Sequence, residues 1–302
     1  MLFAKNEVDL NVITPILKWV GGKRELVPEI SKYYKYLEFN NYHEVFFGGG
    51  AIYIDIIKNF GIGKVKNSYI NDINNDLINL LKVVKSNPNQ LIKDTYRLKS
   101  DFEDFGFYYI RDKFNGIDRQ KKNIEKYKDI ERAAALLVLN RTCFNGLYRI
   151  NKSGLFNVPE GRYINPKIVN ENNILNLSKI LPNIEQITNF EFNKTNSINK
   201  GDLVYFDPPY YPLNKTSSFT EYSGSFGENK QIELFNYFKE LDNKGVYVIL
   251  SNSSSKFIYD LYNEYNPFSV LCSRNINSKG TERGKINEVI VIGNTLRIKL
   301  GL

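Results

Sequence analysis

A short β-prone stretch that runs into three glycines and then an apolar helix restricts the fold of this chain most. Residues 42–47 are mostly apolar and β-prone, and they are followed directly by Gly48, Gly49 and Gly50. Residues 51–57 are apolar and typical of a helix. Strand, glycine turn and helix in this order predict the start of an α/β fold with a ligand site at the end of the strand.

The α/β pattern continues, loosens and then returns. A second strand is predicted at 65–70, and Asp76 opens a helix that runs to residue 85. From about residue 86 the sequence is polar, charged and aromatic, which indicates a separate module inserted into the sheet. Within that module we expect an apolar helix at 132–139 and a turn-rich, hairpin-like stretch at 145–157. After it we expect helices at 172–181, 229–241 and 254–265, and strands at 186–190, 203–206, 246–250 and 288–292.

The composition agrees with a globular protein of a reducing compartment. The chain has 302 residues, of which 42% are hydrophobic and 25% are charged, so it can bury a real core. Two cysteines (Cys143 and Cys272) and a single histidine (His43) make neither a disulfide framework nor a standard zinc site. The chain shows no apolar leader and no long apolar segment. We therefore expect a cytoplasmic protein without a metal and without a membrane segment.

The charge balance favours a polyanionic partner. Lys and Arg outnumber Asp and Glu by 41 to 33, a formal net charge of +8. Residues 85–165 hold 16 basic against 10 acidic residues, a net charge of +6, which leaves 25 against 23 elsewhere. The inserted module therefore carries most of the positive field.

Glycines and a carboxylate at successive strand ends favour a nucleoside ligand. Gly48 and Gly50 lack Cβ atoms, so a ligand can approach the backbone there. Asp72 comes 22 residues after Gly50 and follows the second strand, where a carboxylate can accept hydrogen bonds from ribose hydroxyls. The structural alternatives are a plain turn and a helix-capping Asp. The dinucleotide pattern G-x-G-x-x-G is incomplete, because Tyr53 occupies the third glycine position.

A phosphate-binding loop is excluded by spacing. Gly21, Gly22 and Lys23 look like the end of such a loop. Its pattern requires a glycine at position 17, where this chain has Leu17, and a Ser or Thr at position 24, where it has Arg24. Nucleotide hydrolysis is therefore not expected.

The segment Asp207-Pro208-Pro209-Tyr210 follows a strongly apolar strand and points to chemistry on a planar amine. Two prolines cannot continue a sheet or donate amide hydrogens, so they present carbonyl acceptors from an extended backbone. Asp207 and the Pro208 carbonyl can accept the two hydrogens of an exocyclic amine, while Tyr210 stacks on the ring. The alternative is a strand terminator with a capping Asp.

Five segments of the chain together resemble one family. In sequence order they read KWVGGK, FFGGGA, INDIN, NRTCFNGLYRINKSGLFNVPEGRY and DPPY. They resemble the Dam-type DNA adenine-N6 methyltransferases of bacteria and phages, the alpha group of the D12 class. The similarity runs over nearly the whole chain, and the first and fourth segments are far more specific than DPPY.

The resemblance implies a Rossmann-like α/β sheet of the S-adenosylmethionine-dependent methyltransferases, ending in a reversed hairpin strand. An inserted, mostly helical target-recognition domain with a β-hairpin is expected at 85–165. The catalytic methyltransferase domain then comprises 1–84 and 166–302. The partner is double-stranded DNA, and the site is expected to be GATC, with the target adenine flipped out of the duplex.

The resemblance also implies roles for individual residues. Catalysis is expected at Asp207, Pro208 and Tyr210. The cofactor is expected to contact Trp19, Lys23, Gly48, Gly50, Asp72 and Asp207. DNA contacts are expected from Lys18, Phe144, Asn145, Leu147, Arg149 and Pro159, with Phe144 as a wedge in the space of the flipped base. Without the motifs, Trp19, Phe144 and Leu147 read as ordinary packing residues.

The sequence departs from the family at two positions and leaves competing functions open. Val45 stands where a Pro commonly follows Glu44, and Glu160 brings a carboxylate near the DNA contacts.

Arg274 and the loop 279–285 fit phosphate contacts and a solvated loop equally well. A cytosine-ring nucleophile at Cys143 is disfavoured, because no Pro-Cys pair exists.

Three alternatives of function remain beside the adenine methyltransferase. One is a DNA-binding regulator or restriction specificity module without catalysis, against which the intact motifs argue. The others are an enzyme of the same fold that acts on RNA or on the cytosine amino group. A cognate restriction nuclease of a restriction-modification system is a further partner that the resemblance allows.

Overall fold

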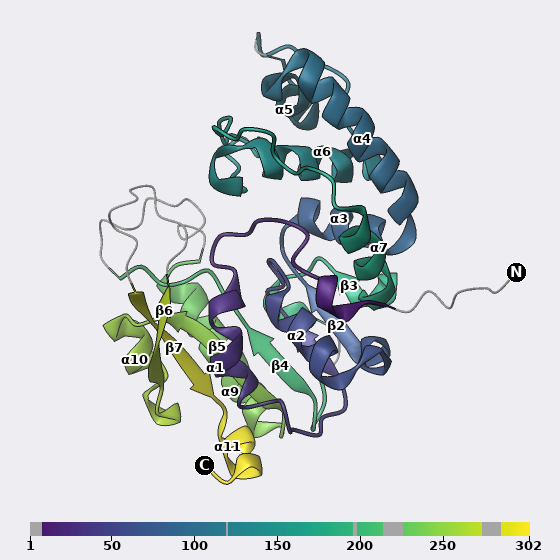
Figure 1. The fold of residues 1–302 in the computed structure, drawn as a ribbon. Coiled ribbons are helices and arrows are strands. Elements are labelled where there is room, and N and C mark those ends of the chain that lie inside the picture. Colours follow the sequence, from purple (N-terminus) through teal and green to yellow (C-terminus); the bar gives the residue numbers. More distant parts are fainter. Residues whose placement is uncertain (1–7, 119, 196–197, 214–225, 274–284) are drawn as a thin grey trace, which may run out of the picture. The chain divides into compact units, whose positions relative to one another are not determined.

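The computed structural model describes residues 8–118, 120–195, 198–213, 226–273 and 285–302, which form two compact units (Figure 1). The first unit comprises Met1–Val20, Gly49–Val65 and Asp76–Ile184. The second comprises Gly21–Gly48, Lys66–Asn75 and Glu185–Leu302. Compactness alone does not show where an inserted domain begins, so the expected division at residues 84/85 and 165/166 stays a prediction.

The second unit is built on one sheet of mixed direction. In the described residues seven strands pair in the order β3-β2-β1-β4-β5-β7-β6. All neighbours are parallel except β7, which runs antiparallel to β5 and β6, so the reversed hairpin expected at the end of the chain is confirmed. The strands are β1 (Tyr42–Glu44), β2 (Ser68–Asn71), β3 (Ile187–Thr188), β4 (Leu203–Phe206), β5 (Tyr247–Ser253), β6 (Phe268–Ser273) and β7 (Lys285–Ile292).

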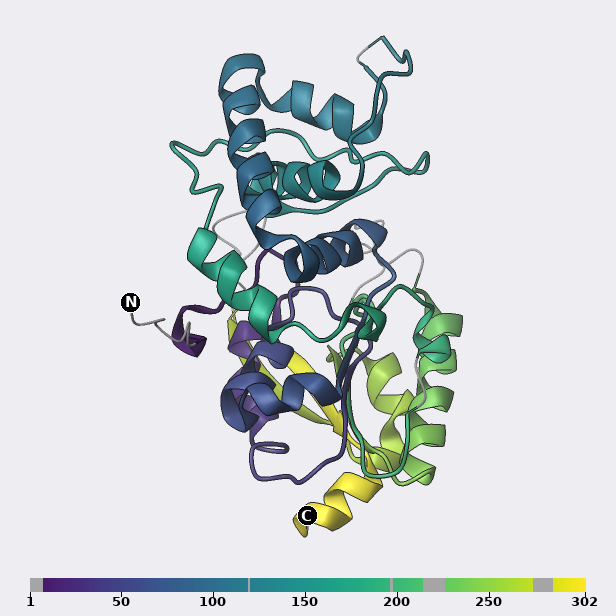
Figure 2. The same cartoon turned by 90° about the vertical axis from the view of Figure 1, so that its right-hand side faces the viewer.

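Helices cover this sheet because its central strands are apolar on both faces. All four side chains of β4 are buried, as parallel strands between two covering layers require. Val204 and Phe206 pack with Leu234 and Phe238 of α9 (Glu228–Asn243) in one core cluster. The same cluster contains Ile258 of α10 (Lys256–Leu261), and Figure 2 shows these green helices on one face of the strands. The short helices α1 (Val27–Ser31) and α11 (Asn294–Leu300) complete this unit.

The parallel strands place their carboxyl ends, which come from distant sequence positions, along one side of the sheet. In the register of the sheet, His43 of β1 lies opposite Tyr69 of β2 and Val204 of β4. Strands β1, β2, β4 and β5 therefore end at the same edge. The segments that leave these strand ends carry the residues from which a site can be built.

The first unit is helical. It contains α2 (Ala51–Phe60), α3 (Asn75–Ser86, beginning one residue before the unit), α4 (Pro88–Phe105), α5 (Phe107–Asn115), α6 (Asp129–Thr142) and α7 (Glu171–Ile180). Figure 1 shows α4 running alongside α6. Every side chain of α6 from residue 133 to 140 is buried, so this helix is the core of the unit. No helix of the described ranges has the length and apolar character needed to cross a lipid bilayer.

A short hairpin follows α6. The backbone N–H of Asn157 donates to the carbonyl of Arg149 over 3.0 Å, and the N–H of Asn151 donates to the carbonyl of Leu155 over 2.9 Å. An antiparallel bridge joins Ile150 to Phe156 between these bonds. The expected hairpin within a mostly helical module is therefore present.

Candidate active site

Asp207 follows β4, and two side chains of the second unit hold its carboxylate. The ammonium nitrogen of Lys23 lies 2.9 Å from Oδ1 of Asp207. The hydroxyl of Ser251, in β5, donates to the same oxygen over 3.2 Å. Because the single hydroxyl hydrogen of Ser251 is used in this way, the Tyr205 hydroxyl at 2.8 Å is the donor to Ser251. The carboxylate is thus fixed at the sheet edge.

Burial decides the protonation of this carboxylate. Burial raises the pKa of Asp207 to about 6, although the Lys23 ammonium opposes the rise and the nearby Glu288 carboxylate adds to it. The Lys23 side chain is only 6% exposed and that of Asp207 20%, so water screens the pair weakly. At neutral pH Asp207 is therefore mostly ionised and needs only a small change of pH to become protonated.

Two contacts hold the Tyr210 side chain, one at its hydroxyl and one at a face of its ring. Its hydroxyl donates to Oε2 of Glu288, in β7, over 2.6 Å. The Lys23 ammonium lies 4.5 Å from the ring centroid, over one face, in a cation–π contact. Burial raises the pKa of Tyr210 well above its ordinary value, so the hydroxyl stays protonated and keeps donating.

The two carbonyls of the proline pair differ. The side-chain amide of Gln231 donates to the Pro209 carbonyl over 2.9 Å. In the part of the chain that the structure describes, no protein donor reaches the Pro208 carbonyl. Within the described residues, this carbonyl keeps its acceptor capacity, and its expected role beside the Asp207 carboxylate stays a prediction.

Asp72 joins the ends of β1 and β2. Its Oδ2 accepts the backbone N–H of Gly48 over 2.8 Å, and its Oδ1 accepts that of Asn74 over 2.9 Å. Burial raises the pKa of Asp72, and these two backbone hydrogen bonds oppose the rise. Gly48 has φ +48°, a left-handed conformation that glycine adopts without strain. The carboxylate thus fixes the glycine turn and retains further lone pairs.

In the first unit, Lys18 is tied to the turn after α6. The side-chain amide of Asn140 pairs with both backbone groups of Lys18, at 2.8 and 2.9 Å, and donates to the Gly146 carbonyl over 2.9 Å. The Lys18 ammonium lies 4.1 Å from the ring centroid of Tyr163. Gly146 has φ +64°, and a Cβ atom there would come within 2.6 Å of the Lys18 side chain. Only glycine fits this position.

The same turn carries Phe144, for which the sequence predicts the role of a wedge. Phe144 is 41% exposed, and its N–H donates to the Pro159 carbonyl over 2.9 Å. Asn145 adopts φ +54° between Phe144 and Gly146, and Leu147 is half-buried. Arg149 is exposed, and its Nε donates to Oδ1 of Asn157 over 2.7 Å. This bond orients its guanidinium.

Trp19 and the remaining glycines also lie in the first unit. Trp19 is half-buried, and its ring stacks on that of Tyr148 with centroids 6.1 Å apart and planes at 22°. A Cβ atom on Gly49 would lie 3.3 Å from Cβ of Trp19, so the glycine allows this close approach. Gly50 has φ +68° and directly precedes α2.

The predicted residues thus fall into two groups. Those of the first unit are Lys18, Trp19, Gly50, Phe144, Asn145, Leu147, Arg149 and Pro159. Those of the second unit are Lys23, Gly48, Asp72, Asp207, Pro208 and Tyr210. Arg274 and the loop 279–284 lie outside the described residues.

Sequence reasoning missed the second-unit residues Ser251 and Glu288, which hold Asp207 and Tyr210. A signal for Ser251 exists, because β5 changes from apolar residues to Ser251-Asn252-Ser253 at its carboxyl end. The rule that selected Asp72 and Asp207, a polar residue at the carboxyl end of a buried strand, also selects this segment.

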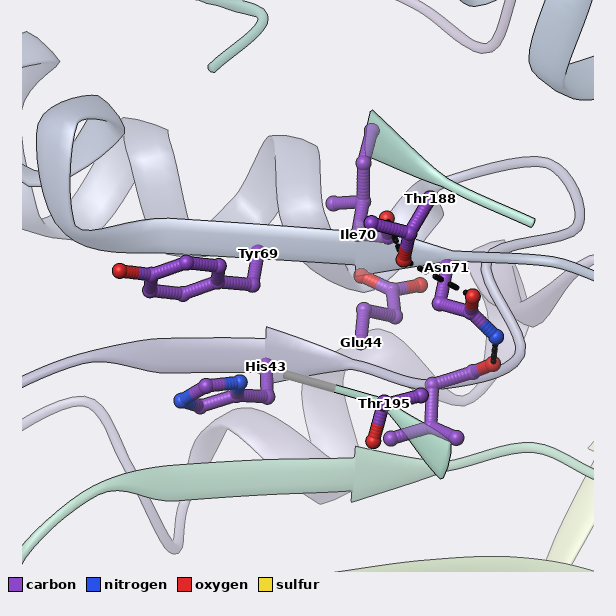
Figure 3. Close-up of a pocket in the computed structure, with 8 residues that line it drawn as sticks. His43, Glu44, Tyr69, Ile70, Asn71, Thr188 and Thr195 are labelled. Carbon is purple, nitrogen blue, oxygen red and sulfur yellow. Dashed lines mark hydrogen bonds between the residues drawn. The ribbon is translucent and has the colours of Figure 1, made fainter. Parts of the chain in front are cut away.

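Two other features of the molecule do not belong to the site. Figure 3 shows a cavity in the second unit lined by His43 and Glu44 of β1, Tyr69, Ile70 and Asn71 of β2, and Thr188 of β3. No residue predicted for catalysis, cofactor or DNA lines it.

Cys143 is fully buried, and burial raises the pKa of its thiol to about 12, so it is not a nucleophile. Within the described ranges, no three His, Cys, Asp or Glu side chains are grouped so that they could hold a metal ion.

Comparisons with known proteins identify the family of this chain. Residues 19–276 match the model of the D12 class N6 adenine-specific DNA methyltransferase family. A type II methyltransferase of Lactococcus lactis subsp. cremoris is 40% identical over 293 residues, which cover 96% of this chain and 98% of the relative. A type II methyltransferase of Methanocaldococcus jannaschii is 40% identical over 90% of this chain and 95% of the relative. A DNA adenine methylase of Serratia marcescens is 32% identical over 91% of this chain and 97% of its own length. This chain therefore belongs to the D12 class of N6 adenine-specific DNA methyltransferases.

Proposed function

We propose that this enzyme moves a methyl group from S-adenosylmethionine to the N6 amino group of a flipped-out adenine in duplex DNA, within the site GATC. The observation that carries the proposal is the pair of acceptors after β4, the Asp207 carboxylate and the Pro208 carbonyl. The family membership supports DNA as the substrate and S-adenosylmethionine as the methyl donor.

The acceptors address the main obstacle to the reaction. The adenine amine is a weak nucleophile, because its lone pair is delocalised into the ring. Asp207 and the Pro208 carbonyl would accept its two hydrogens, which favours a tetrahedral nitrogen with a localised lone pair. The negative charge of Asp207 would offset the positive charge that develops on this nitrogen. The base would stack on the face of Tyr210 opposite to the Lys23 ammonium.

The residues of the second unit fit the cofactor chemically. S-adenosylmethionine supplies a methyl group bound to a positively charged sulfur. Asp72 is half-buried and already ordered by two backbone bonds, so it can accept hydrogen bonds from ribose hydroxyls with little loss of side-chain entropy. The Asp207 carboxylate would face the positively charged part of the cofactor. Lys23 pairs with Asp207, and the Gly48 N–H donates to Asp72. For Trp19 and Gly50 the proposal rests on the resemblance alone.

The DNA contacts are proposed for the first unit. The exposed Phe144 ring supports its role as the wedge that fills the place of the flipped base. Lys18, Asn145, Leu147, Arg149 and Pro159 are the other proposed contacts, and all lie in this unit. Two relatives are named type II methyltransferases, which supports a role beside a restriction nuclease that reads the same site.

Transfer of a labelled methyl group tests the proposal. The wild-type chain is incubated with labelled S-adenosylmethionine and, separately, with GATC duplexes, duplexes that carry every single-base change of GATC, and a matching RNA. We expect label in the GATC duplex alone, on N6 of adenine after digestion to nucleosides. Label on cytosine, label in the RNA, or no label in any substrate contradicts the proposal. Equal label in all the duplexes contradicts the GATC site only.

A further inference from the structure

Two buried side-chain amides clamp the turn that carries Tyr210. Gln231 of α9 and Asn252 of β5 are both fully buried. Nε2 of Gln231 donates to the Pro209 carbonyl over 2.9 Å, and Nδ2 of Asn252 donates to Oε1 of Gln231 over 3.0 Å. Oδ1 of Asn252 accepts the backbone N–H of Tyr211 over 3.1 Å. The chain of hydrogen bonds therefore begins and ends on the two peptide groups that flank Tyr210.

The backbone determines the direction of both amides. The N–H of Tyr211 can only donate, so Asn252 must turn its oxygen toward it, and the N–H of Ser253 donates to the same oxygen over 2.8 Å. Nδ2 of Asn252 then faces Gln231, which must accept through its oxygen. Nε2 of Gln231 is left to donate to the Pro209 carbonyl. A flip of either amide would break at least two of these bonds.

The turn needs such external donors and acceptors. Pro208 and Pro209 have no N–H, so the segment after Asp207 cannot hold itself by its own amide hydrogens. The carbonyl of Pro209 and the N–H of Tyr211 belong to the two peptide groups that flank Tyr210, and the amide pair holds both. The peptide planes around Tyr210 are thereby fixed.

We propose that Gln231 and Asn252 are positioning residues for methyl transfer. They hold the backbone 209–211 and thereby keep the Pro208 carbonyl and the Tyr210 ring in register with the Asp207 carboxylate. Both amides are fully buried, so they act through the turn and not by contact with a substrate. The inference rests on the proposed catalytic role of Asp207 and Pro208.

The test removes the donor without changing the volume of the side chain. Gln231→Met is nearly isosteric and leaves both the Pro209 carbonyl and Nδ2 of Asn252 without their partner. The single-turnover rate of methyl transfer should fall roughly ten- to hundredfold, because small misplacements of reacting groups have effects of this size. The Kd values for S-adenosylmethionine and for duplex DNA should each change less than about threefold.

Gln186→Met is the matched control. Gln186 is also buried in the second unit, and its Nε2 also donates to a backbone carbonyl, that of Lys66, over 2.9 Å. The carbonyl of Lys66 lies in a segment that carries none of the proposed catalytic residues. This variant loses the same kind of hydrogen bond and should keep the wild-type single-turnover rate.

A second variant, Gln231→Glu, makes the donor to the Pro209 carbonyl depend on pH. The protonated carboxyl group donates an O–H to the Pro209 carbonyl and accepts from Asn252, whereas the ionised group has no donor. The rate of Gln231→Glu relative to wild type should therefore rise as the pH falls, and that of Gln231→Met should not. If Gln231→Met does not fold, the pH dependence of the rate of Gln231→Glu relative to wild type decides the question alone.

Asp207→Asn, measured in parallel, separates the two proposals. If Asp207→Asn is inactive while folded Gln231→Met transfers methyl groups at the wild-type rate, the positioning role is wrong and the proposed function stands. A loss in Gln186→Met as large as in Gln231→Met, or a relative rate of Gln231→Glu that does not change with pH, also overturns the positioning role. A wild-type rate in Asp207→Asn overturns the catalytic role proposed for Asp207, on which the positioning role rests.

Discussion

The ammonium nitrogen of Lys23 lies 2.9 Å from Oδ1 of Asp207, and both side chains are largely buried. This ion pair joins the segment before β1 to the segment after β4. The ion pair lowers the pKa of Asp207, but burial raises it more, so the pKa lies at about 6. The protonation of the proposed catalytic carboxylate is therefore set by two opposing effects that can be separated.

The first prediction is that methyl transfer has an acid limit, which is the pH below which its rate falls. Protonated Asp207 has no negative charge to offset the positive charge that develops on the amine nitrogen, so the single-turnover rate should rise with pH through about 6 and then level off. Lys23→Met removes the charge that lowers the pKa of Asp207, so this limit should move to higher pH. The measurement is the rate at saturating cofactor and DNA across this pH range.

Lys256→Met is the control for that shift. Lys256 forms an exposed ion pair with Asp260, at 2.6 Å, on α10 of the same unit. Its loss should leave the acid limit unchanged. An acid limit that stays in place in Lys23→Met would show that a group other than Asp207 is titrating.

The second prediction concerns the cofactor. Asp72→Ala removes the acceptor proposed for the ribose and also the partner of the Gly48 N–H. The loss of charged hydrogen bonds corresponds to roughly ten- to hundredfold weaker binding of S-adenosylmethionine. Titration calorimetry measures it, with Asp260→Ala as the control because Asp260 is exposed on α10. Wild-type affinity in Asp72→Ala would remove Asp72 from the proposed site.

Strand ends were the most predictable part of the molecule. The strand predicted at 203–206 is β4 without a change of bounds, because four consecutive apolar residues between turn-forming segments fit only a buried strand of that length. Asp72 and Asp207 were selected by the same rule, and both follow parallel strands of one sheet. Residue type and local order suffice for such positions.

Features that depend on tertiary contacts were not predictable. The sequence pattern gave no bounds for a helix directly after residue 86, yet residues 88–105 form α4, whose buried side chains are Leu91, Thr95 and Leu98 only. So sparse an apolar stripe gives a weak sequence signal. The partnership of Tyr210 with Glu288 depends on the pairing of β7 with β5, which no local pattern encodes. The hydrogen bonds of Ser251 depend in the same way on its neighbours in β4 and after it.

The third prediction concerns the stability of the first unit. Arg132 grips both carboxylate oxygens of Asp76, at 2.6 and 3.0 Å, and the Tyr148 hydroxyl donates to the same carboxylate over 2.7 Å. Asp76→Ala leaves a largely buried guanidinium without this partner. The free energy of unfolding in urea should fall by about 3 kcal/mol. Glu103→Ala breaks the exposed pair with Lys99 and should cost less than about 1 kcal/mol. Equal losses in the two variants would contradict the buried network.

The last prediction concerns how the target sequence is read. Arg149 is exposed on the hairpin after α6, and the bond from its Nε to Asn157 orients the guanidinium. The planar fork of Arg matches the O6 and N7 edge of guanine. We expect Arg149 to read the guanine that pairs with the final cytosine of GATC, with Leu147 and Pro159 in apolar contact with a thymine methyl group.

Arg149→Ala should therefore lose about 1–3 kcal/mol of discrimination, and chiefly at that one base pair. Lys152→Ala is the control, because Lys152 is an exposed cation of the same hairpin that has no planar fork. Its loss should weaken methylation of all sequences alike, as the loss of a phosphate contact does. Rates are measured on every single-base variant of GATC at one salt concentration, since nonspecific affinity depends on salt. Uniform losses in Arg149→Ala would make Arg149 a backbone anchor and leave the reading of that guanine to another residue.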